Sequence, residues 1–257
     1  MRFFTLLTLE IIILLIFSNH SYSQVNIEKF RESTYERGFS GNVGIDLSSR
    51  TGNVDVKEVT IESRSDYIWK EMNTFLVVRG EYGWQGGKQY SNEALAHMRH
   101  VFRKKTYIQP EVFTQIDYNK KRLLLFRALA GGGLRFEVEK STKTTLWWGT
   151  SLMMEHERYD YKENSSDEKE ANVIRWSNYI TSNIIFTERV KWGMTTYIQP
   201  RIDDFGDVRI LGETNLTTDL AKQLFLKITF RMHYDSKPLD EIKSLDTALG
   251  TGLVLDF

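Results

Sequence analysis

The sequence predicts an all-β fold, a transmembrane antiparallel up-and-down β-barrel of about twelve strands over residues 39–257, preceded by a short N-terminal segment. Three observations predict it. Apolar and polar residues alternate with a period of two along most of the chain, as in strands with two unlike faces. Most of the strand charges fall on one of those faces. The last segment, 247–257, alternates in the same way and ends on the aromatic residue Phe257.

Composition narrows the classes of function. Lys plus Arg and Asp plus Glu each total 34, so no net basic field recommends nucleic acid as a partner. The sequence contains no cysteine, which excludes disulfide bonds, cysteine-ligated zinc and thiol catalysis. Few prolines and many aromatic residues suit long, regular strands.

Residues 1–23 have the pattern of a signal peptide. Arg2 gives a basic start, an apolar run continues to Phe17, and small residues precede the expected cleavage after residue 23. The alternative is a single membrane anchor, which needs about 20 apolar residues. This run is shorter and contains Glu10. Residues 24–38 are mostly polar, and we expect them to form either a periplasmic leader or a short helix that plugs the barrel.

The strands follow from the alternation, taken segment by segment. The clearest is 224–234, where apolar residues oppose Lys227, Arg231 and His233, and the least regular is 54–69. Glycines 131–133 lie inside one strand and predict a kink. The predicted strands are 39–47, 54–69, 75–84, 94–103, 108–117, 126–139, 146–154, 174–186, 190–203, 208–220, 224–234 and 247–257.

The turns between these strands form two sets. The first, on average shorter, would face the periplasm and lies near 70–73, 104–105, 139–144, 188–189 and 221–223. The second would face outward and lies near 48–53, 85–89, 118–122, 160–172, 203–207 and 235–246. Short periplasmic turns, longer external loops and an even number of strands are typical of transmembrane barrels.

The charged face of the strands is expected to point into the lumen. An Arg or Lys on the lipid face at mid-depth would cost roughly 2 to 4 kcal/mol. Twelve strands enclose a lumen wide enough for interlocked polar side chains or a narrow water path, and charges of both signs can neutralise one another there. The predicted lumen-lining polar network is Arg79, Glu81, His97, Arg99, Glu111, Gln115, Asp117, Arg127, Arg135, Glu137, Arg201, Lys227, Arg231 and His233.

Several motifs are spread over nearly the whole chain after residue 23. They are V-N-I-E-K-F-R from Val25, His97-x-Arg99, Phe113-Thr114-Gln115 with Asp117-Tyr118-Asn119, Arg127-x-Leu129-x-Gly131-x-Gly133-x-Arg135-Phe136, Tyr197-x-Gln199-Pro200-Arg201-x-x-Asp204-Phe205-x-Asp207-x-Arg209, and Gly252-Leu253. Together they resemble the salt-induced outer-membrane protein family, a domain of unknown function, in the form common in Bacteroidetes-type bacteria. The resemblance implies an outer-membrane barrel and carries no established reaction.

The leading hypothesis is a monomeric barrel in the bacterial outer membrane, plugged or forming a narrow pore for small solutes. It would contact outer-membrane lipid and lipopolysaccharide. The terminal strand resembles the one that ends bacterial outer-membrane barrels, so we expect the assembly machinery to recognise Phe257. A soluble periplasmic ligand-binding barrel is one alternative, but its apolar face would have to be hidden in a core.

An outer-membrane lipid hydrolase is the second alternative. It would need a Ser-His pair with an orienting Asn or Asp on the lipid-facing side. By register His97 and His233 face the lumen, and His156 adjoins an external loop, so no catalytic residue is assigned. The neighbouring arginines Arg99 and Arg231 disfavour a cation, so neither a metal site nor a cofactor is expected.

Overall fold

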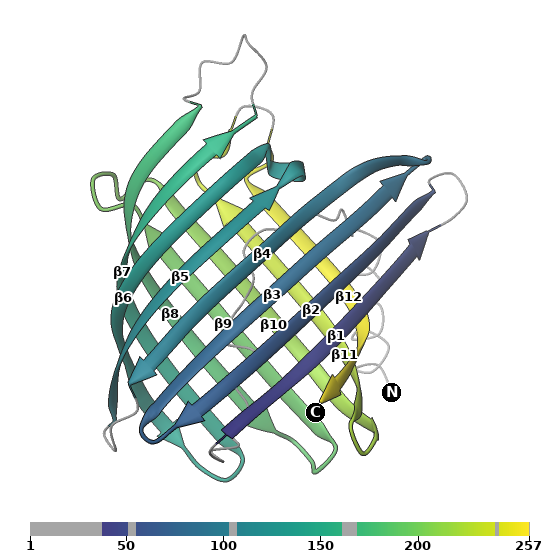
Figure 1. Ribbon diagram of the computed structural model, residues 1–257, viewed down its shortest axis with the longest axis vertical. Helices are drawn as coiled ribbons and strands as arrows, with labels where there is room; N and C mark the ends of the chain where they lie inside the picture. The colour runs from purple at the N-terminus through teal and green to yellow at the C-terminus, as the bar shows by residue number, and fades with distance from the viewer. Residues whose placement is uncertain (1–37, 51–54, 103–106, 161–168, 240–241, 257) are drawn as a thin grey trace, which may run out of the picture.

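The protein is a closed barrel of twelve antiparallel strands (Figure 1). The structure, a computed structural model, describes residues 38–50, 55–102, 107–160, 169–239 and 242–256. Each strand pairs with its neighbours in sequence, and β1 pairs with β12 to close the ring. The strands are β1 (Gly38–Arg50), β2 (Val56–Trp69), β3 (Met72–Gln85), β4 (Lys88–Phe102), β5 (Ile108–Asn119), β6 (Leu124–Lys140), β7 (Thr144–Tyr159), β8 (Glu170–Ile185), β9 (Val190–Pro200), β10 (Val208–Ala221), β11 (Leu224–Asp235) and β12 (Leu245–Asp256).

The predicted fold class is confirmed, and each predicted strand has a counterpart. The largest boundary differences are at β4, which begins at Lys88 rather than 94, and at β7, which continues to Tyr159 rather than 154. At both ends polar residues occupy the outward positions as well, so the alternation of polarity fades before the strand does. The signal peptide, residues 24–37 of the leader, the turn at 104–105 and Phe257 lie outside the described residues.

The outer surface of the barrel is apolar. Alternate residues of the strands point outward, and many are large hydrophobic side chains, such as Leu47 (69% exposed), Ile116 (54%) and Met154 (65%). In a closed barrel the strands satisfy one another's backbone groups, which is what allows such a surface to contact hydrocarbon. The strands have 11 to 17 residues, enough to cross a bilayer at a tilt. Among the described residues, no helix is long and apolar enough to span a membrane.

The glycines of β6 permit close approach. Pairing with β5 and β7 runs through Gly131, Gly132 and Gly133 without interruption, and the register shifts of β6 lie near its two ends. A Cβ on Gly131 would lie 2.6 Å from Cζ of Phe113 and 2.7 Å from the carbonyl oxygen of Leu152. The missing side chains therefore leave room for the Phe113 ring on the lumen side, and the pairing shows no irregularity at the predicted kink.

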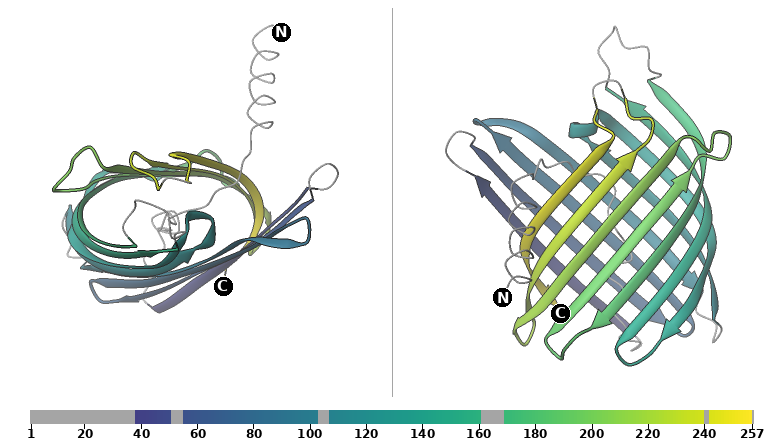
Figure 2. Two further views of the ribbon diagram at one scale, coloured as in Figure 1. Left: turned by 90° about the horizontal axis from the view of Figure 1, so that it is seen from above. Right: turned by 180° about the vertical axis from the view of Figure 1, so that it is seen from behind.

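Seen from above, the barrel is an oval ring (Figure 2). The outer ends of β1 to β4 project away from this ring, as the purple and blue strands show. One short 3-10 turn, η2 (Lys120–Arg122), connects β5 to β6 at the outer end. Side chains that point into the lumen therefore have strands facing them across the narrow width of the oval.

Candidate functional site

The charged face of the strands forms the lining of the lumen. Of the predicted network, the buried members are Arg79, Glu81, His97, Arg99, Glu111, Gln115, Asp117, Arg127, Arg135, Lys227 and His233. Arg231 and Glu137 also point inward, with side chains 13% and 18% exposed. Arg201 lies just beyond the end of β9 and pairs with Asp203 in the outer loop, where its side chain is 33% exposed.

Arg209 is the centre of the densest part of this lining. Its Nη1 lies 3.1 Å from Oε2 of Glu155 and 2.8 Å from Oε1 of Glu157, both on β7. Its Nη2 donates to Glu157 at 3.1 Å, and its Nε donates to Asp235 on β11 at 3.1 Å. One guanidinium on β10 thus holds two other strands of the barrel through buried, charge-assisted hydrogen bonds.

Two further arginines extend this arrangement. Arg175 donates from Nε to Glu155 at 3.2 Å and reaches Asp207 at 2.9 Å. Arg127 lies 2.9 Å from Asp117 and 3.5 Å from Glu157. Each of these buried charges on β6, β7, β8 and β10 therefore has a partner of opposite sign, as burial requires. We call Arg127, Glu155, Glu157, Arg175, Arg209 and Asp235 the outer ion-pair network.

A second cluster lines the wall formed by β2 to β4. Lys121 Nζ lies 2.8 Å from Glu81 and 3.4 Å from Glu58. Arg79 lies 3.3 Å from Glu81 and 3.6 Å from Glu93, and the Ser91 hydroxyl donates to Glu81 at 2.7 Å. Glu81 therefore joins two cations and a hydroxyl.

The η2 turn contacts both this wall and the strands β11 and β12, which lie on the other side of β1. The side-chain oxygen of Asn119 accepts from the backbone N–H of Arg122 at 3.2 Å, and Leu123 adopts a left-handed conformation with φ 56°. From the same turn Arg122 reaches Asp246 on β12 at 3.0 Å and contacts the ring nitrogens of His233 on β11. Burial lowers the pKa of the Arg122 guanidinium to about 10, so it stays charged at neutral pH.

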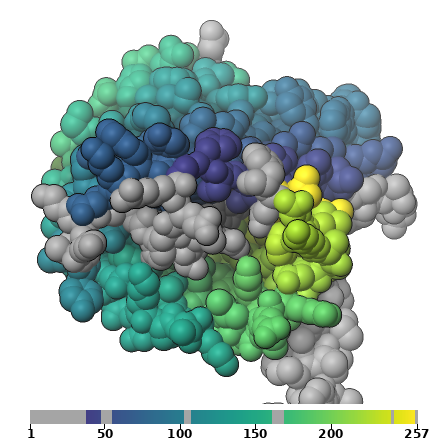
Figure 3. Space-filling model, turned by 60° about the horizontal axis from the view of Figure 1, so that its bottom comes forward, coloured from purple at the N-terminus to yellow at the C-terminus, as the bar shows by residue number. Residues whose placement is uncertain are grey.

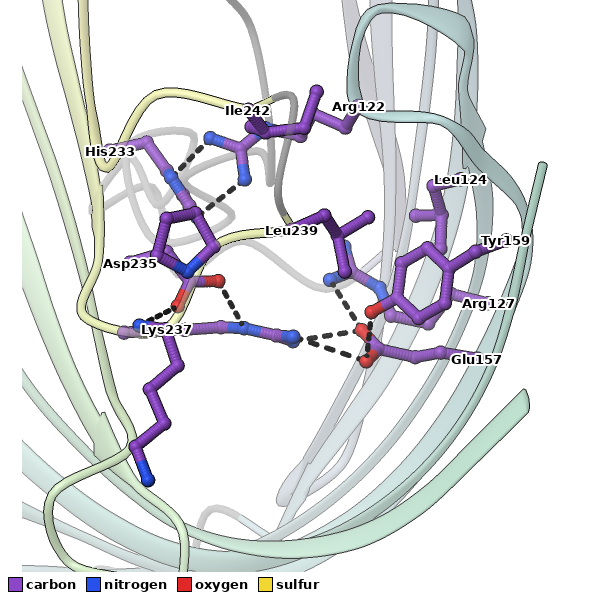
Figure 4. A pocket seen from close by; sticks show the side chains of 12 residues that line it. Arg122, Leu124, Arg127, Glu157, Tyr159, His233, Asp235, Lys237, Leu239 and Ile242 are labelled. Atoms are coloured by element: carbon purple, nitrogen blue, oxygen red, sulfur yellow. Dashed lines mark hydrogen bonds and ion pairs between the residues drawn. The ribbon is translucent and has the colours of Figure 1, made fainter. Parts of the chain in front are cut away.

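Because η2 follows β5 while its partners are on β11 and β12, the contact crosses the lumen. We call Lys121 and Arg122 of the turn, together with their partners Glu58, Glu81, His233 and Asp246, the η2 bridge. Figure 4 shows Arg122 beside His233, and Asp235 and Glu157 on opposite sides of the cavity below. This cavity of about 50 Å³ is lined by both charged and apolar groups, and is large enough for a few water molecules.

Aromatic rings and guanidinium groups face each other deeper in the lumen. Arg64 lies 3.7 Å from the ring centroid of Phe75, and Arg135 lies 3.7 Å from that of Trp147. The Tyr179 hydroxyl donates to Glu111 at 3.0 Å. Such contacts let cations rest against a partly apolar wall. A second cavity, of about 30 Å³, is lined by side chains from β4 to β10, among them Phe113, Gln115, Tyr197 and Gln199.

About half of the buried charged residues and histidines of the lining are absent from the network predicted from the sequence. The missed residues that form ion pairs include Glu58, Glu62, Arg64, Glu93, Glu155, Glu157, Arg175, Arg209 and Glu213. Many lie on β2 and β10, where serine, threonine or glycine at outward positions blurs the alternation, or on the ends of β4 and β7. A signal was present in β2: Glu58, Thr60, Glu62, Arg64 and Asp66 occupy every second position.

The three histidines considered for lipid hydrolysis, His97, His156 and His233, have amide or guanidinium partners, whereas His100 on β4 lies 2.7 Å from the Thr74 hydroxyl on β3. His97 hydrogen-bonds Gln115 in the lumen at 3.1 Å, while His156 faces outward and hydrogen-bonds Asn172 at 2.9 Å. The outward positions around His156 hold Ala128, Met154, Arg158 and Ile174, which carry no nucleophilic hydroxyl. In the part of the chain that the structure describes, no group of three His, Cys, Asp or Glu side chains is placed to hold a metal ion.

Comparisons with known proteins concern the fold and the family of the chain. No curated protein matches the chain. Among solved structures, the chain is similar to the NanC porin at 9% identity, with a TM-score of 0.50 and coverage of 84% of this chain and 98% of that one. The translocator domain of the autotransporter NalP from Neisseria meningitidis matches at 7% identity and a TM-score of 0.47, with coverage of 85% and 87%. A family model described as "Protein of unknown function, DUF481" matches residues 42–257, so the chain belongs to this family.

Proposed function

We propose that this chain is a barrel of the bacterial outer membrane that forms a narrow, charge-lined passage for small polar solutes. The η2 bridge is the observation that carries the proposal. It places charged side chains across the lumen, and a cavity lined by both charged and apolar groups lies below it. A restriction built from paired charges can be hydrated, whereas a packed hydrocarbon core cannot. Charges of both signs line the passage, so we expect weak selectivity between anions and cations.

Planar-bilayer recording of the protein without residues 1–23 tests this passage. We expect a small single-channel conductance, which Arg122→Ala raises because it removes the contact with Asp246 and His233. Arg158→Ala is the matched control, since Arg158 faces outward on β7 and its loss leaves the lumen unchanged. Silence at all voltages in the protein and in Arg122→Ala would overturn the passage.

Deletion of residues 24–37 distinguishes between the two roles predicted for this segment, a plug of the barrel and a periplasmic leader. If this segment plugs the barrel, its deletion raises the conductance further. If it is a periplasmic leader, the conductance stays as it was. The deletion removes no residue of the η2 bridge, so its effect and that of Arg122→Ala are measured in separate variants.

We also propose the location and the route of assembly. The apolar outer surface supports contact with outer-membrane lipid and lipopolysaccharide around a monomer. Deletion of Phe257 should lower the amount in the outer-membrane fraction if the assembly machinery recognises this residue. Faster migration of the unboiled protein in detergent gels would separate a membrane barrel from a soluble periplasmic one. Membership of the salt-induced branch, in its Bacteroidetes-type form, predicts higher expression at high salt.

A further inference from the structure

The seam between β1 and β12 closes over a short length only. Its register covers five residue pairs, from Asn42 with Asp256 to Asp46 with Gly252. The other neighbouring strands share between eight and fifteen described pairs. Among the described residues, β1 continues beyond Asp46 to Arg50 paired with β2 alone, and residues 245–251 of β12 pair with β11 alone. At the inner end the yellow β12 lies against the purple β1 (Figure 3), whereas the outer end of β1 projects from the ring (Figure 2).

The open part of the seam lies at the depth of the apolar outer surface. Leu47 on β1 is 69% exposed, and Leu245 and Leu249 on β12 are 52% and 37% exposed. Ile228 and Phe230 on β11 continue this surface beside them. An unpaired strand edge is not tolerated against hydrocarbon, and persists at membrane depth only where it lines a water-filled space. The edge of β12 therefore borders an extension of the lumen.

The inner side of the seam is lined by small residues. Ala248, Gly250 and Gly252 are the inward positions of β12 around the point where pairing stops. A Cβ on Gly252 would lie 2.9 Å from the carbonyl oxygen of Ile45 and would collide with the Asp46 carboxylate, so the strands touch here. A Cβ on Gly250 would meet nothing within 4 Å. Within two residues of β12, from Gly252 to Gly250, close contact with β1 is thus replaced by open space.

Charged groups of the lumen lie directly behind this opening. Asp246 is on β12 itself and joins Arg122 of the η2 bridge at 3.0 Å. Next to the opening, behind the paired part of the seam, Lys227 on β11 reaches Glu62 on β2 at 3.4 Å. The outward side of β12 here carries exposed leucines, and its inward side carries Asp246, which is paired with Arg122. An apolar and a charged surface are therefore separated by the width of one strand. This order of surfaces matches a molecule that is apolar at one end and polar at the other.

We propose that the outer half of the β1–β12 seam is a lateral portal, through which a membrane lipid places its headgroup in the lumen while its acyl chains stay in the bilayer. A lipid fits better than an added peptide strand, because the opening joins an apolar to a charged surface and β1 leans away from β12. The proposal goes beyond the passage along the barrel axis, and either could exist without the other.

Photocrosslinking from inside the lumen tests the portal. The chain has no cysteine, so Gly250→Cys can carry a benzophenone maleimide at a unique site in open space. Ser151→Cys on β7, which also faces the lumen, is the matched control on the far wall. In vesicles of phosphatidylethanolamine and phosphatidylglycerol, we expect protein–lipid adducts by intact mass spectrometry from the Gly250 site and few from the Ser151 site. Equal yields, or adducts to protein in place of lipid, would overturn the portal.

Amide hydrogen exchange gives a second, label-free measurement. The unmodified barrel is placed in micelles, and its fold is checked by heat-modifiable migration. We expect the amides of 245–251 that point away from β11 to exchange faster than those of 253–255, which face β1. Equal protection of the two stretches would mean that the ladder is continuous, and would also overturn the proposal.

Discussion

The β6–β7 wall and the β1–β12 seam are two ways of joining neighbouring strands in the same barrel. The wall has fifteen register pairs, against five in the seam. On its lumen side the wall carries Arg127, Glu155 and Glu157, which are tied to other strands, whereas the inward residues of β12 near the seam are mostly glycine and alanine. Cross-strand side-chain pairs stabilise a sheet locally. The β1–β12 seam therefore closes the ring with few contacts, while the β6–β7 wall supplies many of the contacts that stabilise it.

The largest expected effect is the loss of Arg209 from the wall. Arg209→Met leaves Glu155, Glu157 and Asp235 buried without their shared cation, and breaking such buried pairs costs about 3 to 5 kcal/mol. The free energy of unfolding, measured by urea titration in micelles, should fall by this amount. Arg201→Met is the control, because Arg201 pairs with an exposed Asp203 and should change stability by about 1 kcal/mol or less. Equal losses in the two variants would contradict the assigned role of the outer ion-pair network.

A pair of glycine substitutions compares the packing of wall and seam. In Gly149→Ala on β7, the new methyl group would collide with the ring of Tyr179, and overpacking of this kind costs about 1 to 3 kcal/mol. In Gly250→Ala on β12 the methyl group enters open space and should leave the unfolding free energy nearly unchanged. The same urea titration measures both. A larger loss for Gly250→Ala would reverse the comparison.

The contribution of side chains to the stability of the seam can be measured at the Lys227–Glu62 ion pair. The pair joins β11 to β2 across the two closing strands, at 3.4 Å. A double-mutant cycle with Lys227→Met and Glu62→Gln should give a coupling energy of roughly 0.5 to 3 kcal/mol, the range for contacting residues. The cycle is read from urea midpoints of the four proteins. A coupling near zero would mean that backbone pairing alone holds the seam.

The smallest expected effect is a pH dependence in the outer loops. The hydrogen bond from Lys237 lowers the pKa of Asp204 below 3.8, and the same contact raises the pKa of Lys237 above 10.5. The loop contact is therefore strongest between these values, and is lost as pH falls through the lowered pKa or rises through the raised one. Carbon-13 titration of the Asp204 carboxyl should show a midpoint below 3.8 that moves upward in Lys237→Gln. An unchanged midpoint would contradict the contact.

The fold was predictable from sequence because barrel strands repeat one simple rule. In β11 the inward Lys227 and Thr229 alternate with the outward Ile228 and Phe230, and no knowledge of distant residues is needed to see it. The same rule placed Arg127 and Arg135 on the lumen side. It failed to find Glu58 and Glu62, because Ser63 and Ser65 stand at outward positions of the same strand.

The partners inside the lumen could not be predicted in the same way. Arg209 meets Glu157 because the sheet curves round and brings β10 to face β7, and neither the curvature nor the register is written in a local pattern. Arg122 was assigned to an outer loop, and nothing in its neighbourhood indicates that the loop turns inward. Arg201 has the inward parity of its strand, but the strand ends at Pro200, so its side chain remains in the outer loop.

In the passage that we propose, the η2 bridge has a consequence for the size of the solute that can pass. It reaches from the β5–β6 connection to β2 and β3 on one side of the β1–β12 seam and to β11 and β12 on the other. A contact that crosses the lumen in this way would divide the outer mouth of the proposed passage into two smaller openings, or lobes. The cut-off of the barrel is then set by the width of a single lobe, so a barrel of twelve strands should sieve as tightly as one with fewer strands until the contact is released.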